Sequence, residues 1–386
     1  MDGKKREEPA SPPDGSTHLL RIQTMTVGFG IAPNQRFRAR GLYRRSGISP
    51  CPEDITMFSC PQEYTRAGGA CQPAVTRPAG GEYTGMTTNK AKRPDGRFMM
   101  LRAKNIWVAG GDPRQAALAA LLADDGHSVH TYALERGEGR RCEPSMAGAD
   151  RADCVVLPLP AAGPDGRLNA PLAEREHELS EVLDALRPGQ LVCAGMAGEA
   201  LEEMAAARGL ALRDYFAREE LAVMNAVATA EGALQIAMEE LPITLHDARV
   251  LVAGFGRLGR ALGPRLRALG ARVWVCARRY EQRAAAECMG LGSEGMDRLS
   301  DWLCSYDLVF NTVPAPVLGV EELAALKEGA LVIDLASRPG GVDLDAAAAL
   351  GVRVVWALSL PGKVAPVTSG RYIKNTIYHI MEESDL

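Results

Sequence analysis

The sequence predicts an α/β protein with two doubly wound parallel-sheet domains, joined by a long helix and preceded by a disordered N-terminal extension. Three observations support this prediction. Short apolar runs alternate with helical patterns from Lys104 to the C-terminus. One long helical pattern, at 219–240, interrupts the alternation. Residues 1–98 show neither period and contain 10 Pro and 12 Gly.

These patterns divide the 386 residues into five parts. Residues 1–98 are either an unstructured extension or a leader upstream of a true start at Met99 or Met100. The remaining parts are a substrate domain, an interlobe helix, a dinucleotide-binding domain and a C-terminal helix that packs back on the first lobe. Their predicted ranges are 99–218, 219–241, 242–364 and 365–386.

Composition excludes several classes of protein. The net charge of -4 combines 15 Lys+Arg against 9 Asp+Glu in 1–98 with 29 against 39 in 99–386. Such a balance supplies no field for holding nucleic acid. No run of eighteen uncharged apolar residues predicts a membrane span. The nine cysteines are scattered, which indicates a reduced, cytoplasmic chain and predicts no metal site.

In the first domain, apolar runs and helical patterns follow one another in βαβ order. The predicted strands are 105–111, 128–132, 152–159, 190–194 and 211–214, and the predicted helices are 115–123, 174–186 and 199–208.

The long helix, 219–240, carries a mostly apolar stripe with one carboxylate in it. Desolvation on this stripe would make the Glu231 carboxylate a stronger proton acceptor, which would suit a general base. The alternative is a buried structural glutamate bonded to the backbone or to an arginine. Met224, Val227, Ala228, Glu231, Leu234 and Met238 form the stripe.

The second domain repeats the alternation, ends with a loop at 361–366 and continues into a helix at 370–381. Its predicted strands are 249–253, 272–276, 308–311, 331–334 and 353–356, and its predicted helices are 259–269, 281–289, 321–325 and 345–349.

A GxGxxG motif lies between the first strand and the first helix of this domain, at 254–259. Gly254 allows a tight turn, Gly256 lets the backbone approach a pyrophosphate, and Gly259 lets helix and strand pack closely. Arg257 and Leu258 lie between them at the helix N-terminus, which favours an anion. Both domains are therefore predicted to be Rossmann-like, and the second to bind a dinucleotide.

The second strand of this domain ends at Cys276-Ala277-Arg278-Arg279. An NAD-binding domain usually places a carboxylate here on the ribose. Two guanidinium groups match a 2′-phosphate better, so Arg278 and Arg279 predict NADP as the cofactor. The alternative is that one arginine is a solvated residue at a helix start.

Loops after other strands supply further candidates, since ligands bind at the carboxyl ends of parallel strands. Asp112 and Arg114 would bind a substrate carboxylate, unless Asp112 only caps the helix that Pro113 begins. Arg338 could instead hold its loop to Asp334 or Asp343. The nicotinamide-side candidates are Asn311, Thr312 and Pro314, and the substrate-side candidates are Arg218, Ser337, Arg338 and Lys363.

Four segments carry a resemblance to a known family: VAGGDPRQ at 108–115, AREELAVMNAVATAEGAL at 217–234, LASRPGG at 335–341 and LPGKVAP at 360–366. With the glycine motif, they make residues 104–382 similar to the dipicolinate synthase A-subunit family of spore-forming Firmicutes. The resemblance implies oxidation of dihydrodipicolinate to pyridine-2,6-dicarboxylate with NADP+, in the mother cell of a sporulating bacterium. It also implies a flavoprotein-like partner, the B-subunit of dipicolinate synthase, and an oligomer.

A substrate with two carboxylates requires two anion sites, for which Arg114, Arg338 and Lys363 are the cations, and a base, for which Glu231 is the first candidate. Glu219 and Asp334 are the other candidates for this base. Two alternatives stay open: another NADP-dependent dehydrogenase of a small hydroxy or amino acid, and a non-catalytic NADP-binding regulatory subunit.

Overall fold

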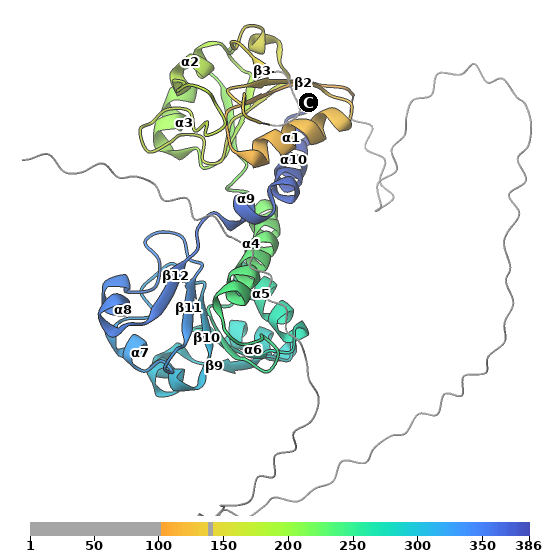
Figure 1. Cartoon of the computed structure of the whole chain (residues 1–386). Helices are drawn as coiled ribbons and strands as arrows, with labels where there is room; N and C mark the ends of the chain where they lie inside the picture. Colours follow the sequence, from red (N-terminus) through yellow and green to blue (C-terminus); the bar gives the residue numbers. More distant parts are fainter. Residues whose placement is uncertain (1–101, 138–141) are drawn as a thin grey trace, which may run out of the picture. The chain divides into compact units, whose positions relative to one another are not determined.

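Two parallel six-stranded sheets organise the described residues, 102–137 and 142–386, of this computed structural model (Figure 1). This confirms the predicted fold class, two Rossmann-like domains. The prediction for residues 1–98 lies outside the described residues. All described residues fall within one compact unit.

The first sheet has the order β3-β2-β1-β4-β5-β6, and every neighbouring pair is parallel. Its strands and helices are β1 (Asn105–Ala109), α1 (Pro113–Asp124), β2 (Ser128–Tyr132), β3 (Cys142–Glu143), β4 (Cys154–Val156), α2 (Leu179–Asp184), β5 (Leu191–Ala194), α3 (Gly198–Ala207) and β6 (Ala211–Asp214).

The second sheet has the order β12-β11-β10-β7-β8-β9 and is parallel throughout. The strand order reverses between β7 and β10, and ligands bind at such a switch point. Its elements are β7 (Arg249–Ala253), α5 (Arg257–Ala268), β8 (Arg272–Cys276), α6 (Tyr280–Cys288), β9 (Gly292–Glu294), β10 (Leu308–Asn311), α7 (Val320–Ala324), β11 (Leu331–Asp334), α8 (Leu344–Leu350) and β12 (Arg353–Trp356).

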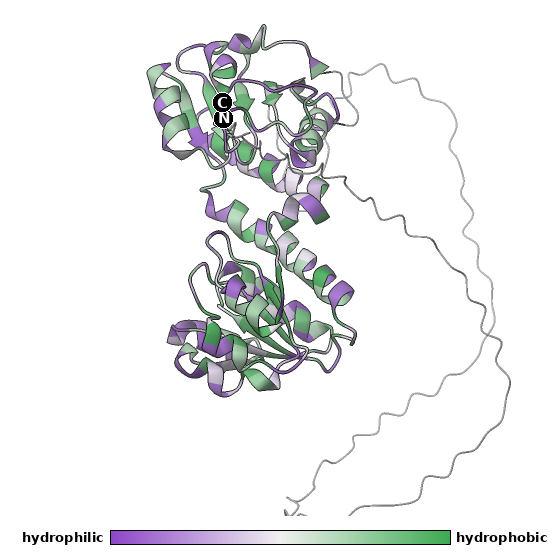
Figure 2. Ribbon diagram, turned by 60° about the vertical axis from the view of Figure 1, so that its left-hand side comes forward, coloured by the Kyte–Doolittle hydropathy of each residue, from purple (hydrophilic) through white to green (hydrophobic). Residues whose placement is uncertain are grey.

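The central strands are unbroken apolar runs because helices cover both faces of a parallel sheet. Residues 250–253 of β7 and 331–333 of β11 are fully buried, and hydrophobic residues follow the strands of both sheets (Figure 2). The sequence pattern misses β3 and β9, since both are two- or three-residue edge strands without an apolar run. It also extends α2 too far at both ends.

The long helix α4 (Glu219–Glu240) forms as predicted, but of the predicted stripe only Ala228 and Leu234 are buried. Met224 and Met238 are 39% and 57% exposed. The buried face instead carries small residues, and a Cβ added to Gly232 would lie 3.1 Å from Val364. Small side chains let α5 and α9 pack close to α4. Among the described helices, only α4 is long and apolar enough to cross a membrane by length and composition, and its buried face packs like that of a core helix.

The segment predicted as a loop at 361–366 is largely helical. Helix α9 (Leu360–Val364) has Pro361 in its first turn, and α10 (Pro366–Glu383) begins at Pro366. Proline is compatible with the first turn because the backbone N–H there has no intrahelical partner. The two prolines therefore mark two helix starts.

Helix α10 packs on α1 of the first domain, far from it in sequence. The ammonium of Lys374 lies 2.5 Å from a carboxylate oxygen of Asp125, and Tyr378 donates to the same oxygen over 2.7 Å. His127 shares the Tyr378 hydroxyl at 2.9 Å. Burial raises the pKa of Asp125, but the hydrogen bonds from Lys374 and Tyr378 outweigh it, so the pKa lies below its usual 3.8.

We expect Asp125→Asn to lower the free energy of unfolding by about 2 kcal/mol at neutral pH, since it leaves the buried Lys374 ammonium without its carboxylate. The folded pKa of Asp125 is depressed, so its contribution is full above pH 3.8 and is lost as the pH falls through the folded value. The difference between wild type and variant should therefore narrow below about pH 4.

Urea unfolding of the full chain between pH 3 and 8 measures this difference. Asp124→Asn is the matched control, because Asp124 is exposed on the same turn and forms no ion pair among the described residues. Equal unfolding midpoints for the two variants at pH 7 would contradict the prediction.

Candidate dinucleotide and substrate site

The glycine motif follows β7 and opens α5, as its sequence context requires. Gly254 has φ +93°, and Gly256 caps a helix whose first turn has no side-chain cap. A Cβ on Gly259 would lie 2.4 Å from the Gly254 carbonyl oxygen, so only glycine fits there. Gly254 and Gly259 are thus explained by the packing of the protein itself.

Gly256 differs from its two neighbours. It has φ -82°, which any residue can adopt, and a Cβ added to it would meet no atom within 4 Å. The fold therefore does not need glycine at this position. Open space beside the free N–H groups of a helix start is what a pyrophosphate requires, so the residues present fit a dinucleotide. Arg257 pairs with Glu219 at 3.4 Å, and Leu258 packs partly buried against the core.

The loop after β10 lies against the glycine motif. Thr312 donates to the Ala253 carbonyl over 2.9 Å, and its hydroxyl oxygen would lie 2.4 Å from a Cβ on Gly254. The amide of Asn311 is fully buried and bonded to Val313 and Asp334. Asn311 and Thr312 thus hold the loop through internal bonds, and their predicted contact with the cofactor stays a prediction. Pro314 is exposed.

A buried carboxylate fixes the next loop. Asp334 is 1% exposed and accepts hydrogen bonds from the Asn311 amide (2.8 Å) and from the N–H groups of Ala336 (3.0 Å) and Gly341 (2.9 Å). These bonds define the segment 335–341. Since its oxygens are engaged in the loop, Asp334 is a positioning residue, and the alternative of a general base loses support.

The segment 335–341 exposes Ser337 and Arg338. Among the described residues, Arg338 forms no ion pair or hydrogen bond, so it does not hold the loop to Asp334 or Asp343. Trp356, which the sequence reasoning missed, donates from its indole to the Ala336 carbonyl over 2.9 Å. A tryptophan at a strand end is the only sequence signal for this contact.

Arg278 and Arg279 are exposed directly after β8. Arg279 lies 3.3 Å from the Glu281 carboxylate. Arg278 forms neither an ion pair nor a hydrogen bond with any described residue. Arg278 is therefore the freer of the two predicted cations.

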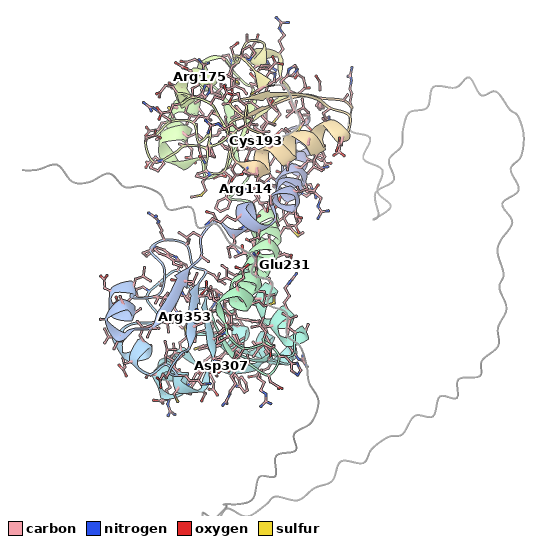
Figure 3. The ribbon with its side chains drawn as sticks, viewed as in Figure 1. Arg114, Arg175, Cys193, Glu231, Asp307 and Arg353 are labelled. Carbon is pink, nitrogen blue, oxygen red and sulfur yellow. The ribbon has the colours of Figure 1, made fainter. Side chains whose placement is uncertain are left out.

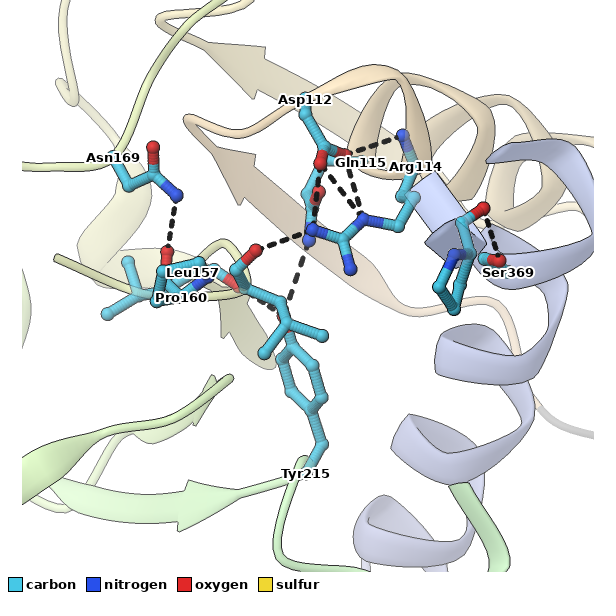
Figure 4. A network of polar contacts seen from close by, with 10 residues as sticks. Asp112, Arg114, Gln115, Leu157, Pro160, Asn169, Tyr215 and Ser369 are labelled. Atoms are coloured by element: carbon cyan, nitrogen blue, oxygen red, sulfur yellow. Dashed lines mark hydrogen bonds and ion pairs between the residues drawn. The ribbon is translucent and has the colours of Figure 1, made fainter. Parts of the chain in front are cut away.

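In the loop before α1, Asp112 and Arg114 bond to each other and to the backbone (Figure 4), and their predicted substrate contacts stay predictions. Asp112 caps α1 by accepting from the Arg114 N–H over 2.9 Å. The Arg114 guanidinium is nearly buried, pairs with Asp112 at 2.7 Å and donates to the Leu159 carbonyl over 2.6 Å. The space above Gly110 is occupied by Leu168, which a Cβ there would meet at 3.0 Å.

The structure does bring two predicted segments together at this loop. A Cβ on Gly362 of α9 would lie 3.1 Å from the Arg114 guanidinium and 3.3 Å from the Asp112 carboxylate. The next residue, Lys363, is exposed and has no ion-pair partner in the part of the chain that the structure describes. Arg114 and Asp112 thus support the helix that presents Lys363.

Arg218, predicted to bind substrate, forms ion pairs within the protein. Its guanidinium donates two hydrogen bonds to Glu383 of α10, at 2.8 and 2.6 Å, and one to Glu220 at 2.9 Å. These bonds raise the pKa of Arg218 and lower that of Glu383. Arg218 therefore ties the start of α4 to the end of α10.

Glu231 does not meet the condition that made it a candidate base. Its side chain is 61% exposed on α4 and lies 3.8 Å from the Arg265 guanidinium (Figure 3). The residue lies on the outer face of the helix because the alanine and glycine face is the buried one. Without burial, the hypothesis of a base favoured by desolvation is wrong.

Comparisons with known proteins follow the two-domain division. Residues 105–216 match the family described as the N-terminal domain of the dipicolinate synthase A-subunit. Residues 214–350 match the family described as D-isomer specific 2-hydroxyacid dehydrogenase, NAD binding domain. The dipicolinate synthase A-subunit of Bacillus subtilis (strain 168) is 29% identical over 290 residues, which cover 74% of this chain and 98% of the relative.

Two crystal structures agree with these matches. The dipicolinate synthase A-subunit from Bacillus halodurans superposes with a TM-score of 0.68 at 27% identity, over 73% of this chain and 99% of that one. The corresponding dipicolinate synthase structure from Bacillus subtilis gives a TM-score of 0.67 at 29% identity, over 74% and 97%. The resemblance to the dipicolinate synthase A-subunit is thereby confirmed, and the protein is an oxidoreductase with a nicotinamide-dinucleotide domain.

The two motif glycines should respond differently to alanine. We expect Gly256→Ala to leave the unfolding midpoint unchanged and to weaken dinucleotide binding about tenfold or more, because its Cβ enters the space for the pyrophosphate. Gly259→Ala should lower the unfolding free energy by several kcal/mol, since its Cβ collides with the Gly254 carbonyl.

Urea unfolding and calorimetric titration with NADP+ and NAD+ measure the two effects separately. A Gly256→Ala protein that binds dinucleotide like the wild type would show that the open space at Gly256 is not the pyrophosphate site.

Proposed function

We propose, from the resemblance to the dipicolinate synthase A-subunit, that this chain oxidises dihydrodipicolinate to dipicolinate with NADP+ as the hydride acceptor. The single observation that carries the substrate half of this proposal is Arg338. Its exposed guanidinium has no ion-pair or hydrogen-bond partner among the described residues and lies on a loop that the buried Asp334 fixes. Contacts continue from that loop to the glycine motif through Gly341, Asn311, Thr312 and Gly254.

The cofactor half rests on two features of the second domain. The open space at Gly256 is suited to the pyrophosphate. Arg278 has no ion-pair or hydrogen-bond partner among the described residues, so its guanidinium can pair with a 2′-phosphate. The oxidised nicotinamide, when bound, supplies the two-electron acceptor for a hydride. No carboxylate follows β8 until Glu281, which already pairs with Arg279. This charge distribution supports NADP over NAD.

The substrate carries a carboxylate on each side of its ring and needs two cations. Arg338 and Lys363 are the two predicted cations that the structure leaves exposed and unpaired among the described residues. Arg114 and Arg218 are neutralised internally. We therefore assign the substrate carboxylates to Arg338 and Lys363, with the exposed Ser337 hydroxyl beside Arg338 as a hydrogen-bond donor.

Aromatisation removes one hydride and one proton from the ring. The hydride passes to the nicotinamide, and a base or solvent must take the proton. Glu231 is exposed and Glu219 is exposed and paired with Arg257. Aromatisation provides the driving force, so we propose that solvent water takes the proton and that the side chains only orient the ring.

The proposal includes a partner. The resemblance implies a flavoprotein-like B-subunit, together with an oligomeric assembly in the cytoplasm of the mother cell. The reaction should therefore be measured with and without that partner.

The direct test is formation of dipicolinate, followed by its ultraviolet absorbance, from the condensation product of aspartate semialdehyde with NADP+. We expect product with the wild-type chain, and a KM for the substrate raised about tenfold or more in Arg338→Ala and in Lys363→Ala, because each loses a charge-assisted contact. Arg151→Ala, an exposed arginine of the first domain, is the control.

The alternatives predict other results. Another small-acid dehydrogenase would reduce NADP+ with a hydroxy or amino acid and yield no dipicolinate. A regulatory subunit would bind NADP+ without turnover in either condition. Either result would overturn the proposed reaction.

Cofactor choice has its own test. We expect Arg278→Asp to raise the KM for NADP+ about tenfold or more and to leave that for NAD+ within about twofold, since the carboxylate repels only the 2′-phosphate. Steady-state kinetics with both cofactors measure this, with Arg151→Asp as the charge-matched control. An unchanged KM for NADP+ would contradict the assignment.

A further inference from the structure

A guanidinium that the sequence reasoning did not select lies at the same end of β8 as Arg278 and Arg279. Strand β9 pairs in parallel with β8, and the Ala277 N–H donates to the Glu294 carbonyl over 3.1 Å. A Cβ on Gly295, directly after β9, would lie 3.3 Å from a terminal nitrogen of Arg283. Helix α6 therefore brings the Arg283 guanidinium to the edge where the two arginines leave β8.

An aromatic ring steadies this guanidinium. The Arg283 guanidinium carbon lies 4.3 Å from the centroid of the Tyr280 ring, a cation–π distance. Tyr280 itself is 81% exposed, in the first turn of α6. A large aromatic side chain left this open to solvent does not contribute to the core, and its ring instead contacts the Arg283 guanidinium.

Arg283 lacks the partners that the structural arginines have. Its Nε is buried without any hydrogen-bond partner, whereas Arg114 and Arg218 each donate several bonds to carboxylates or carbonyls. Polar groups that are buried and unpaired are rare because they cost free energy. The charge of Arg283 is therefore available to a ligand.

Neighbouring carboxylates do not neutralise the Arg283 guanidinium. Glu281 pairs with Arg279, and neither Glu294 nor Asp297 comes within ion-pair distance of Arg283 among the described contacts. Both lie near the Cys276 thiol, whose pKa is raised to about 12 by burial and by Asp297 and Glu294, and is partly lowered by Arg283. Arg278 and Arg283 are thus two unpaired cations beside the end of β8.

We propose that Arg283, held over the Tyr280 ring, binds the 2′-phosphate together with Arg278 and makes the chain select NADP over NAD. This inference rests on the proposed function, because it assigns a further residue to the same cofactor site. Tyr280 acts through Arg283 and is a positioning residue. Arg279, neutralised by Glu281, contributes less than its position in the sequence suggests.

The test is calorimetric titration of the full chain with 2′,5′-ADP, which carries the 2′-phosphate, and with 5′-AMP, which does not. We expect Arg283→Met to weaken binding of 2′,5′-ADP about tenfold or more and to change binding of 5′-AMP less than about twofold. Arg283→Lys should restore part of the loss. Tyr280→Ala should weaken binding of 2′,5′-ADP several-fold, whereas Tyr280→Phe, which keeps the ring, should leave that binding unchanged.

Arg298→Met is the matched control, since Arg298 is exposed in the same domain and pairs with Asp301 at 2.6 Å. An Arg283→Met protein that keeps the wild-type preference for 2′,5′-ADP would overturn the role of Arg283 and leave the proposed function intact. If Arg283→Met weakened binding of 2′,5′-ADP and 5′-AMP equally and lowered the urea midpoint, Arg283 would have a structural role. That result would also overturn its proposed role in binding the 2′-phosphate. A wild-type chain without preference for 2′,5′-ADP would instead refute the NADP assignment itself.

Discussion

The loops at the carboxyl edge of the second sheet depend on one buried ion, the carboxylate of Asp334. A carboxylate at 1% exposure is costly to bury unless its oxygens accept hydrogen bonds, and here an amide from β10 and two backbone N–H groups donate to them. The Asn311 side chain, in turn, donates to the Val313 carbonyl and accepts from the Val313 N–H. The ends of β10 and β11 are thereby locked together, and the neighbouring Thr312 hydroxyl reaches the glycine turn after β7. The exposed residues of segment 335–341 are thus held in place by the buried Asp334 and Asn311.

The arginines of the described chain fall into two groups with different consequences. Arg114 and Arg218 are paired with carboxylate and carbonyl oxygens, and these internal bonds hold helices in place. Arg278, Arg283 and Arg338 have no such acceptors. None of these three guanidinium groups forms an ion pair among the described residues. Arg278 and Arg338 follow the carboxyl ends of parallel strands, where α/β sheets bind ligands, so recognition of an anion is the more economical explanation for their charge.

The sequence predicts the strands, the dinucleotide motif and the long helix well because each depends on local spacing. It does not predict which face of α4 is buried, since that depends on how closely α5 and α9 approach. Alanines and Gly232 allow that approach, and the larger Met224 and Met238 remain outside. The sequence does not predict the internal bonds of Arg114 and Arg218 for a similar reason. Each has one partner nearby in sequence, Asp112 or Glu220, but the others, Leu159 and Glu383, are 45 and 165 residues away, and no local pattern indicates them.

The return of α10 to α1 has a consequence for how the first domain comes into being. Its core includes Tyr372, Ile373 and Ile377, together with Leu118 and Leu122, so this folding unit is discontinuous in the chain. A recombinant fragment ending near residue 216 would expose the apolar side of α1 to water. During synthesis that surface stays uncovered until α10 has left the ribosome, so the first of the two sheet domains is completed only after the second has been made.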